Sequence, residues 1–296
     1  MPLQPSSPDL PEPAGTDPHP IDPDRALTAI APFYDLDFGA IDHDLPLYTN
    51  LAQRGQGRIL ELGAATGRLA IPLAQAGHTV TALETNDAMR RLGETRMRDA
   101  GVTLLPHDIR DFHLNQPFDL ITCALSTFCH LLTPRDQHRT LTAIAQHLAP
   151  DGLTVIDLPA LTADDWERGP RPLQLEWVRT DPRTNRTVTK LATLQAEPAT
   201  QTQHVTYLYD EHCEPIPQSR EPADPATHPS VQRTLAQFPL RHVFRFEMEH
   251  LLRAAGLTPT GWYGTYDLDP PSHGERLIVI AQRTAADHGE AVEGAE

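Results

Sequence analysis

This 296-residue chain has few cysteines, no long apolar run and a shortage of basic residues. Its three cysteines are odd in number and lack the spacing of metal ligands, which predicts reduced thiols in a cytoplasmic protein, without a disulfide framework or a bound metal. No apolar run approaches the roughly 18 residues of a transmembrane helix, so we expect no membrane association. The N-terminus also lacks the charged start and apolar core of a signal peptide.

The 24 Lys and Arg residues stand against 40 Asp and Glu, which gives a formal net charge of −16. Much of this charge lies at the two ends, because residues 1–24 and 284–296 are acidic and contain no Lys or Arg. Both segments are predicted to be disordered tails, since they cannot bury enough apolar surface to fold. No basic stripe remains, so a nucleic-acid partner is not expected. Residues 25–283 are long enough for one large α/β domain.

The stretch from Gly57 to Ile71 predicts a strand, a tight turn and a helix in immediate succession. The apolar run Ile59–Leu62 has the length of a buried strand, small residues fill Gly63–Gly67, and Gly77 supplies a helix stop. Small residues let the backbone approach a ligand closely, and N–H groups at a helix start favour a nucleotide-like ligand. A turn that binds nothing is the alternative that this stretch alone leaves open.

Spacing separates two kinds of nucleotide-binding turn. A dinucleotide-binding turn needs a third glycine, and Arg68 occupies that position. The pattern acidic-x-G-x-(G/A)-x-G, headed by Glu61, instead resembles motif I of the class I S-adenosylmethionine-dependent methyltransferases, with Ala65 in place of the middle glycine. The resemblance implies S-adenosylmethionine as cofactor. It also implies that Gly63, Ala65 and Gly67 receive the methionine part, with Glu61 and Arg68 as further cofactor-binding residues.

A second strand, Thr79–Glu84, ends in an acidic residue about 20 residues beyond the glycine turn. An acid at this place can accept hydrogen bonds from both ribose hydroxyls, which favours Glu84 as the ribose ligand over a solvated glutamate at a strand end. Asn86 then caps a helix that contains Met89 and stops at Gly101. Both Asn86 and Met89 are expected beside the cofactor.

The third strand, Val102–Leu105, precedes the sequence His-Asp-Ile-Arg-Asp-Phe. In the resembling family an acid here contacts the adenine amino group and its apolar neighbour packs on the ring, which implies these roles for Asp108 and Ile109. Asp108 as a cap of the following turn is the alternative. The fourth strand, 117–124, leads into a turn that resembles motif IV of small-molecule methyltransferases. Leu125 in this turn is expected beside the methionine end through its backbone, where ligands bind in open α/β sheets.

Two residues are candidates for the catalytic step. His130 follows the fourth strand, and its unperturbed pKa near neutrality suits a general base that takes a proton from the acceptor. A packed structural histidine is the evenly weighted alternative. Tyr34 lies in a helix expected from Arg25 onward and interrupted by Pro32, and in similar enzymes an N-terminal aromatic residue folds over the cofactor. A simple core aromatic is the alternative for Tyr34.

After a fifth strand, 153–158, the β-α alternation gives way to an antiparallel insert over about 165–245. Sugar-amine N-methyltransferases carry a similar layer that roofs the acceptor pocket or pairs subunits, so the resemblance implies a homodimer as one arrangement. The last strand, 276–282, is expected to run antiparallel to its neighbours. Period-two runs predict insert strands at 173–179, 188–194 and 205–209, with 234–244 as a candidate fourth and a Pro-rich loop over 211–230.

Together these motifs predict an α/β fold: a doubly wound, Rossmann-like sheet of seven strands with an antiparallel insert after the fifth. The expected activity is methyl transfer from S-adenosylmethionine to a small-molecule acceptor, with an amine nitrogen preferred and a hydroxyl oxygen as the alternative. A nicotinamide-dependent oxidoreductase is disfavoured by Arg68. A cofactor-binding scaffold without catalysis stays open, because Ala65 and His107 replace glycines of the family pattern.

Overall fold

The computed structural model describes residues 22–55, 57–167, 169–213 and 230–284. The predicted disordered tails, 1–24 and 284–296, lie outside the described residues except at their inner ends. There, Asp22 accepts hydrogen bonds from the backbone of Asp24 and Arg25 and caps the first helix. Within these described ranges, no helix is both long enough and apolar enough to span a membrane.

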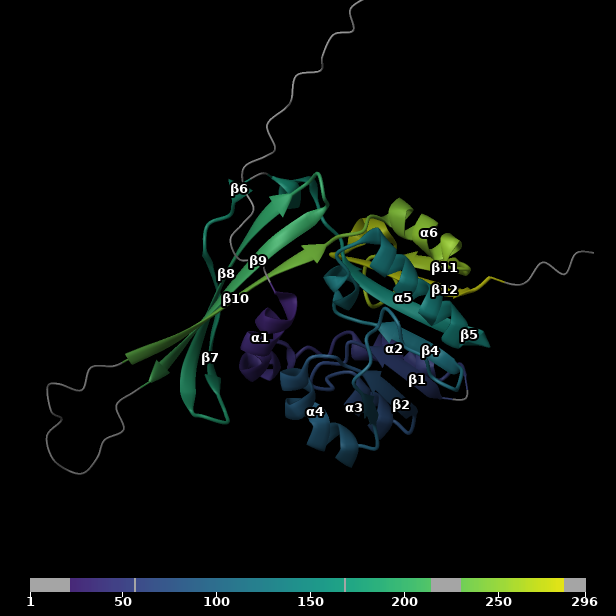
Figure 1. Cartoon of the computed structure of the whole chain (residues 1–296), viewed down its shortest axis with the longest axis horizontal. Coiled ribbons are helices and arrows are strands. Elements are labelled where there is room, and N and C mark those ends of the chain that lie inside the picture. The colour runs from purple at the N-terminus through teal and green to yellow at the C-terminus, as the bar shows by residue number, and fades with distance from the viewer. Residues whose placement is uncertain (1–21, 56, 168, 214–229, 285–296) are drawn as a thin grey trace, which may run out of the picture.

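Seven strands form one sheet in the order β11-β12-β5-β4-β1-β2-β3 (Figure 1). The strands from β5 to β3 run parallel, while β12 is inserted antiparallel between β5 and β11. The predicted fold class is therefore confirmed, including the antiparallel last strand. The strands are β1 (Arg58–Leu62), β2 (Thr79–Leu83), β3 (Thr103–Leu105), β4 (Phe118–Cys123), β5 (Leu148–Pro159), β11 (Leu257–Tyr263) and β12 (Arg276–Arg283).

Helices cover both faces of this sheet, because successive side chains of a buried strand point to opposite sides. On one face Leu60 and Ile156 pack with residues of α5 and α6. On the other face Ile59 and Val155 pack with residues of α2, α3 and α4. The helices are α2 (Leu45–Ala52), α3 (Ala70–Gln75), α4 (Asp87–Asp99), α5 (Pro134–His147) and α6 (Arg245–Ala254).

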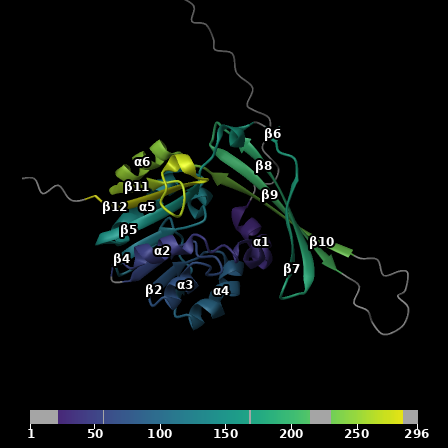
Figure 2. The ribbon, with the colours of Figure 1, turned by 180° about the vertical axis from the view of Figure 1, so that it is seen from behind.

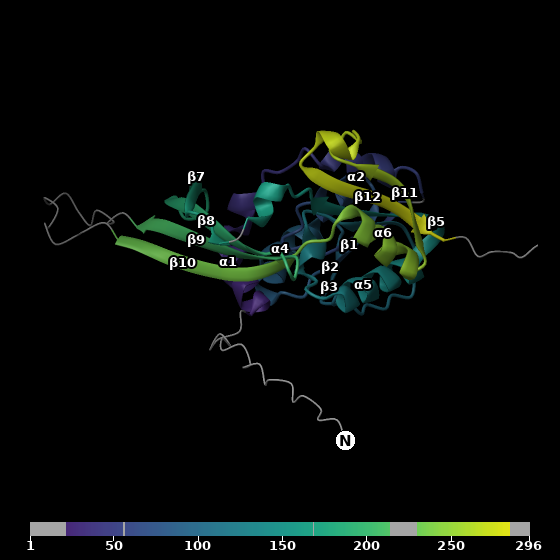
Figure 3. The same ribbon diagram turned by 90° about the horizontal axis from the view of Figure 1, so that it is seen from above.

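A second, antiparallel sheet follows β5 in the sequence and lies beside the first (Figures 1 and 3). The sequence predicts three strands and a candidate fourth; the structure adds the two-residue strand β6, which pairs with β8, and makes the fourth a full strand. The predicted loop over 211–230 begins later, because β9 continues to Cys213, and 214–229 lie outside the described residues. The strands are β6 (Gly169–Pro170), β7 (Gln174–Asp181), β8 (Arg186–Glu197), β9 (Thr202–Cys213) and β10 (Ser230–Arg241).

Helix α1 (Pro23–Phe38) lies between the two sheets (Figures 1 and 2). The prediction that Pro32 interrupts this helix is wrong, since α1 is continuous with Pro32 in its interior. Proline removes one backbone hydrogen bond and crowds the preceding turn. The neighbouring side chains offset that cost: Ile30 and Phe33 join an apolar cluster with the antiparallel sheet, and the Phe33 and Tyr209 rings stack with centroids 4.4 Å apart. Tertiary packing here outweighs local propensity.

Candidate functional site

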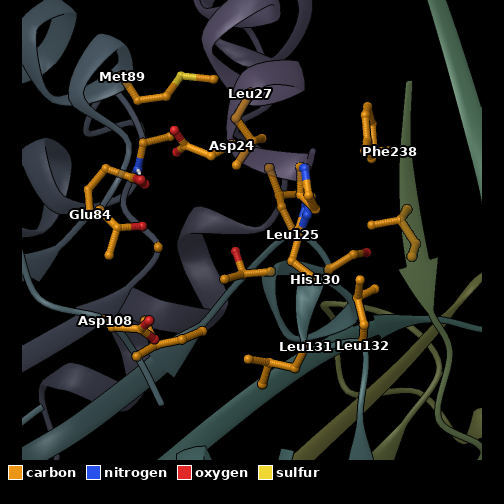
Figure 4. Close-up of a pocket in the computed structure, with 18 of the residues that line it drawn as sticks. Asp24, Leu27, Glu84, Met89, Asp108, Leu125, His130, Leu131, Leu132 and Phe238 are labelled. Carbon is orange, nitrogen blue, oxygen red and sulfur yellow. Dashed lines mark hydrogen bonds between the residues drawn. The ribbon is translucent and has the colours of Figure 1, made fainter. Parts of the chain in front are cut away.

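A cavity of about 730 Å³ opens at the carboxyl ends of β1, β2 and β4, with α1 and β10 on its other side (Figure 4). This volume is typical of a small-molecule site. Glu61, Gly67, Arg68 and Asn86 are not part of its lining. The other residues predicted for the site do line it: Tyr34, Gly63, Ala65, Glu84, Met89, Asp108, Ile109, Leu125 and His130.

Three residues of the turn after β1 have positive φ, and two of them, Gly63 and Ala65, line the cavity. Gly63 has φ +72°, and a Cβ at this position would lie 2.5 Å from Thr127 Cγ2, so glycine allows β1 to end against the turn after β4. Ala65 replaces the glycine of the family pattern and adopts φ 47°. Its methyl group joins the apolar cluster of α1 and the antiparallel sheet. The substitution therefore adds packing against α1 while the turn keeps its left-handed backbone.

The Glu84 carboxylate lies at the cavity and is held by the backbone of two turns. Its Oε2 accepts a hydrogen bond from the Ala65 N–H at 2.9 Å, and its Oε1 accepts one from the Asn86 N–H at 2.8 Å. Burial raises the pKa of this carboxyl, and the backbone N–H groups oppose that rise. Each oxygen has a second lone pair, so the carboxylate can still accept hydrogen bonds from a ligand.

Asn86 joins two helices rather than facing the cavity. Its side-chain oxygen accepts a hydrogen bond from the Met89 N–H and caps α4. Its Nδ2 donates to Asp24 Oδ1 at 2.8 Å and to Thr28 Oγ1 at 3.0 Å, both in α1. Asn86 thereby fixes the first half of α1 to the parallel-sheet layer, while the side chain of Met89 lines the cavity.

Glu61 and Arg68 are buried beside the turn. The Arg68 guanidinium donates to both carboxylate oxygens of Asp44, at 2.7 and 2.6 Å. Glu61 accepts a hydrogen bond from the backbone of Ala70, the first residue of α3. That N–H is therefore satisfied within the protein and is not offered to a ligand. Burial raises the pKa of Glu61 to about 8, against the opposing charge of Arg68.

Gly67 also has a packing role. It adopts φ +91°, and a Cβ at this position would lie 2.6 Å from Cγ of Met97 in α4. The glycine therefore lets the turn approach α4 closely.

Asp108 reaches the cavity already paired with a neighbour. Its Oδ1 accepts hydrogen bonds from the backbone N–H of Arg110 at 2.8 Å and from Nε at 2.9 Å, and its Oδ2 accepts one from Nη2 at 2.5 Å. The Arg110 hydrogen bonds hold the pKa of Asp108 below its usual range. These contacts agree with the alternative that Asp108 caps the following turn. The role of Asp108 in binding adenine stays a prediction. Ile109 lines the cavity beside it.

Leu125 and Ser126 form a turn after β4 in which both residues have positive φ, 45° and 65°. Such a pair of non-glycine residues needs outside support, which Asp157 at the end of β5 supplies. The Asp157 Oδ2 accepts a hydrogen bond from Leu125 N at 3.0 Å, and the Asp157 carbonyl oxygen accepts one from Ser126 N at 3.1 Å. The same carboxylate accepts from Arg276 Nε at 2.7 Å and from the Tyr266 hydroxyl at 2.8 Å.

The sequence analysis does not identify this arrangement. Asp157 lies 109 residues from Tyr266 and 119 from Arg276, so no local pattern connects them. The available signal is the position of Asp157 at the carboxyl end of a central strand, next to the switch from parallel to antiparallel pairing. Burial raises the pKa of the Asp157 carboxyl, and the Arg276 charge opposes that rise.

His130 ends the short 3₁₀ helix Thr127–His130 and lines the cavity. Its ring stacks on Phe238 of β10 with centroids 5.8 Å apart, and among the described residues its shielded Nδ1 has no hydrogen-bond partner. Burial lowers the pKa of His130 to about 4, well below its unperturbed value, and its catalytic role stays a prediction. The imidazole is neutral at pH 7. In Figure 4 it lies between Glu84 and Asp108 on one side and Phe238 on the other.

Tyr34 belongs to an aromatic wall, defined here by Tyr34, Phe38, Tyr207, Phe238 and Leu240, all of which line the cavity. The Tyr34 and Phe38 rings lie 4.9 Å apart. Burial raises the pKa of Tyr34, so its phenol stays neutral. The structure places Tyr34 at the cavity and also packs it with apolar residues of α1, so its catalytic role stays a prediction.

A buried ion pair behind this wall also escaped the sequence analysis. Lys190 Nζ lies 2.5 Å from Asp37 Oδ2 and 4.0 Å from the centre of the Tyr207 ring. Asp37 also accepts hydrogen bonds from Trp177 Nε1 at 3.0 Å and from the Tyr209 hydroxyl at 2.9 Å. The pair fixes the end of α1 to the antiparallel sheet. One signal was available: Lys190 shares a face of β8 with the buried Val188, where a lysine needs a partner.

The lining of the cavity suits an organic ligand. Over the described ranges, no group of three or more His, Cys, Asp or Glu side chains is arranged to hold a metal ion. A turn that glycine lets approach closely, a carboxylate with free lone pairs and apolar side chains together suit S-adenosylmethionine.

Residues 59–152, which contain the turns after β1, β2 and β4, match the family model described as a methyltransferase domain. Residues 59–152 therefore carry a methyltransferase domain. The resemblance inferred from motif I is thereby confirmed. Over 78 residues, which are 26% of this chain and 30% of the relative, the chain is 41% identical to the dTDP-4-amino-2,3,4,6-tetradeoxy-D-glucose N,N-dimethyltransferase of Saccharopolyspora spinosa.

The chain spans between 30% and 52% of the length of the curated relatives it matches. Solved structures extend the likeness of the methyltransferase fold further. The CcbJ methyltransferase from Streptomyces caelestis aligns with a TM-score of 0.73 at 17% identity, over 89% of this chain and 100% of that chain. An amino pentose methyltransferase from Micromonospora echinaspora, solved with its methyl donor bound, aligns with a TM-score of 0.63 at 21% identity, over 85% and 96%. At these identities the likeness establishes the fold.

Proposed function

We propose that this protein transfers a methyl group from S-adenosylmethionine to the amine nitrogen of a small molecule. The observation that carries the proposal is that one cavity joins the motif I turn and Glu84 to the neutral imidazole of His130. Gly63 and Ala65 would hold the methionine part, Glu84 the ribose, and Asp108 with Ile109 the adenine. When bound, S-adenosylmethionine supplies a methyl group on a positively charged sulfur, which an acceptor lone pair can displace.

An amine suits this cavity better than a hydroxyl. A hydroxyl must lose its proton during attack, and His130 with a pKa of about 4 is too weak a base to take it readily. A neutral amine already has the lone pair that attacks the methyl group. A ring nitrogen of His130 then accepts a hydrogen bond from the amine N–H and orients the lone pair. The S. spinosa relative is likewise named as an N,N-dimethyltransferase.

Calorimetric titration with S-adenosylhomocysteine, beside a nicotinamide dinucleotide control, tests the cofactor. We expect micromolar binding of the first compound alone, and binding of the dinucleotide alone would overturn the proposal. Turnover of amines beside their hydroxyl analogues, followed by mass spectrometry, tests the reaction. Methylation confined to the hydroxyl analogues would assign the protein to O-methyl transfer. Tight cofactor binding without turnover of any acceptor would instead support a silent scaffold.

We also propose a homodimer formed through the outer face of the antiparallel sheet. Four leucines stand directly opposite one another across β7, β8, β9 and β10, on the face turned away from the aromatic wall. These are Leu175, Leu191, Leu208 and Leu235, and the two outer ones are exposed. A two-fold axis along the strands would place this row on the same row of a second copy, which suits an isologous contact.

Light scattering coupled to gel filtration tests the dimer. We expect Leu235→Glu to give monomers, while the matched control Gln237→Glu on the same strand and face leaves the dimer intact. A wild-type protein that stays monomeric at high concentration would contradict this arrangement.

The three cysteines are free thiols, and we propose a cytoplasmic location on that basis.

A further inference from the structure

The polar part of the cavity is strongly anionic. Five carboxylate side chains line it, those of Asp22, Asp24, Glu84, Asp108 and Asp136. Within the described lining, Arg110 is the one Lys or Arg side chain. Its guanidinium is already bonded to both oxygens of Asp108 and lies 3.9 Å from Asp136.

The aromatic wall on the other side is apolar. Tyr34 and Phe38 come from α1, Tyr207 from β9, and Phe238 and Leu240 from β10. The His130 ring that stacks on Phe238 is neutral at pH 7. Flat rings of this kind pack well on rings and aliphatic surfaces, and they attract the positive edge of an amine.

Among the described residues, the lysine that lies against this wall is not available to a ligand. Lys190 lies against the Tyr207 ring, yet its side chain is 5% exposed and its ammonium is paired with Asp37. Releasing it toward a ligand would leave Asp37 buried without its counter-charge, which is strongly unfavourable. An anionic acceptor would therefore meet carboxylates on one side and rings on the other.

We infer that the acceptor carries its amine on an uncharged, largely apolar body that packs on the aromatic wall, and that amines on phosphorylated or nucleotide-diphosphate carriers are poor acceptors. This inference rests on the proposed methyl transfer and narrows its substrate class. A diphosphate placed here would lose its hydration without gaining a cation, which disfavours binding. The chain would differ in this respect from the S. spinosa relative, whose name specifies a dTDP-linked amino sugar.

Paired acceptors test the inference, because each pair holds the amine constant and changes only its carrier. One pair is a nitrophenyl glycoside of an amino sugar and the dTDP ester of the same amino sugar. The other is N-methylbenzylamine and its ring-phosphorylated analogue. We expect kcat/KM for each uncharged member to exceed that of its phosphorylated partner by about ten-fold or more. Equal or faster turnover of either phosphorylated member overturns the inference, and so does a panel in which neither uncharged member is methylated.

A matched pair of variants connects the preference to the wall. Leu240→Arg places a guanidinium among the rings and should reduce the preference for the uncharged acceptors by about ten-fold, whereas Leu240→Met should retain it. An unchanged preference in a folded Leu240→Arg protein counts against the inference. Titration with S-adenosylhomocysteine separates the two proposals, because intact cofactor binding with the wrong acceptor preference refutes the substrate class alone. Absent cofactor binding refutes the proposed function itself.

Discussion

The two sides of the cavity are built in different ways. On the cofactor side, turns after parallel strands place backbone groups and carboxylates at the cavity. The two hydrogen bonds that Glu84 accepts there join residues 19 and 2 positions apart in the chain. On the proposed acceptor side, aromatic rings come from α1 and the antiparallel sheet. The Lys190–Asp37 pair that fixes them joins residues 153 positions apart. The first side is thus specified by local sequence and strand topology, and the second by long-range packing.

The largest expected effect tests whether the acceptor side depends on its buried ion pair. Asp37→Ala strands the Lys190 ammonium and removes the acceptor of Trp177 and Tyr209. Breaking a buried pair in this way should lower the free energy of unfolding by about 3–5 kcal/mol, as measured by urea denaturation. The control Asp42→Ala changes an exposed aspartate and should cost no more than about 0.5 kcal/mol. If Asp37→Ala and Asp42→Ala had equal free energies of unfolding, the buried ion pair would not be what holds this side of the cavity together.

The next effect concerns Glu61, beside the turn on the cofactor side. Above the ordinary pKa of a glutamate, Glu61 is ionised in the unfolded chain but stays protonated in the folded protein until the pH approaches 8. The free energy of unfolding therefore falls as the pH rises through this interval. Between about pH 5.5 and 7 this loss amounts to about 2 kcal/mol. Glu61→Gln cannot titrate, so urea denaturation should show it gaining that amount on the wild type over this interval. The exposed control Glu197→Gln should track the wild type, and a Glu61→Gln curve parallel to the wild type would contradict the shift.

A smaller effect is expected at Glu84. Removing its carboxylate takes away the proposed ribose acceptor and leaves the N–H groups of Ala65 and Asn86 without a partner. Glu84→Ala should weaken S-adenosylhomocysteine binding in calorimetry by about 10- to 100-fold, or about 1.4–2.7 kcal/mol. The exposed Glu94→Ala on α4 serves as the control. Unchanged affinity in Glu84→Ala would refute the ribose assignment.

The smallest effect is expected at His130, where the two sides meet. His130→Gln retains a hydrogen-bonding group without the ring, and kcat should fall by about ten-fold, with little change in cofactor affinity. Because burial lowers the pKa of His130 to about 4, the imidazole does not titrate between about pH 5.5 and 7.5. The kcat/KM profiles of variant and wild type should therefore have the same shape. An inflection near pH 6.5 in the wild type alone would show a histidine that titrates as in water.

Local features could be predicted from the sequence because their causes are local. The run Ile59–Leu62 followed by Gly63–Gly67 forms the strand and turn as expected. Asn86 caps α4, and the alternation in the insert locates its long strands. The cavity also gathers most residues that the family motifs suggest, because parallel strands bring their carboxyl ends to one edge.

The features that could not be predicted depend on the surroundings of each group. Pro32 is tolerated because α1 is packed between two sheets. The sequence of the helix alone does not reveal this packing. The pKa of His130 follows from burial beside Phe238, which lies 108 positions further along the chain. The contacts of Asp157 with Tyr266 and Arg276 likewise join segments far apart in the chain. Such pairs become visible only once the topology is known.

The hydrogen bonds between Asp157 and the Leu125–Ser126 turn have a consequence for folding during synthesis. Chains emerge from the ribosome with the N-terminal end first, and contacts of large sequence separation form late. The motif I turn and Glu84 are complete once residue 86 has appeared, but Asp157 gains Arg276 only when the last strand is made. The nascent chain can therefore assemble its cofactor turn long before the turn after β4 acquires its full set of hydrogen bonds. The turn after β4 is in this sense completed by the last strand to be synthesised.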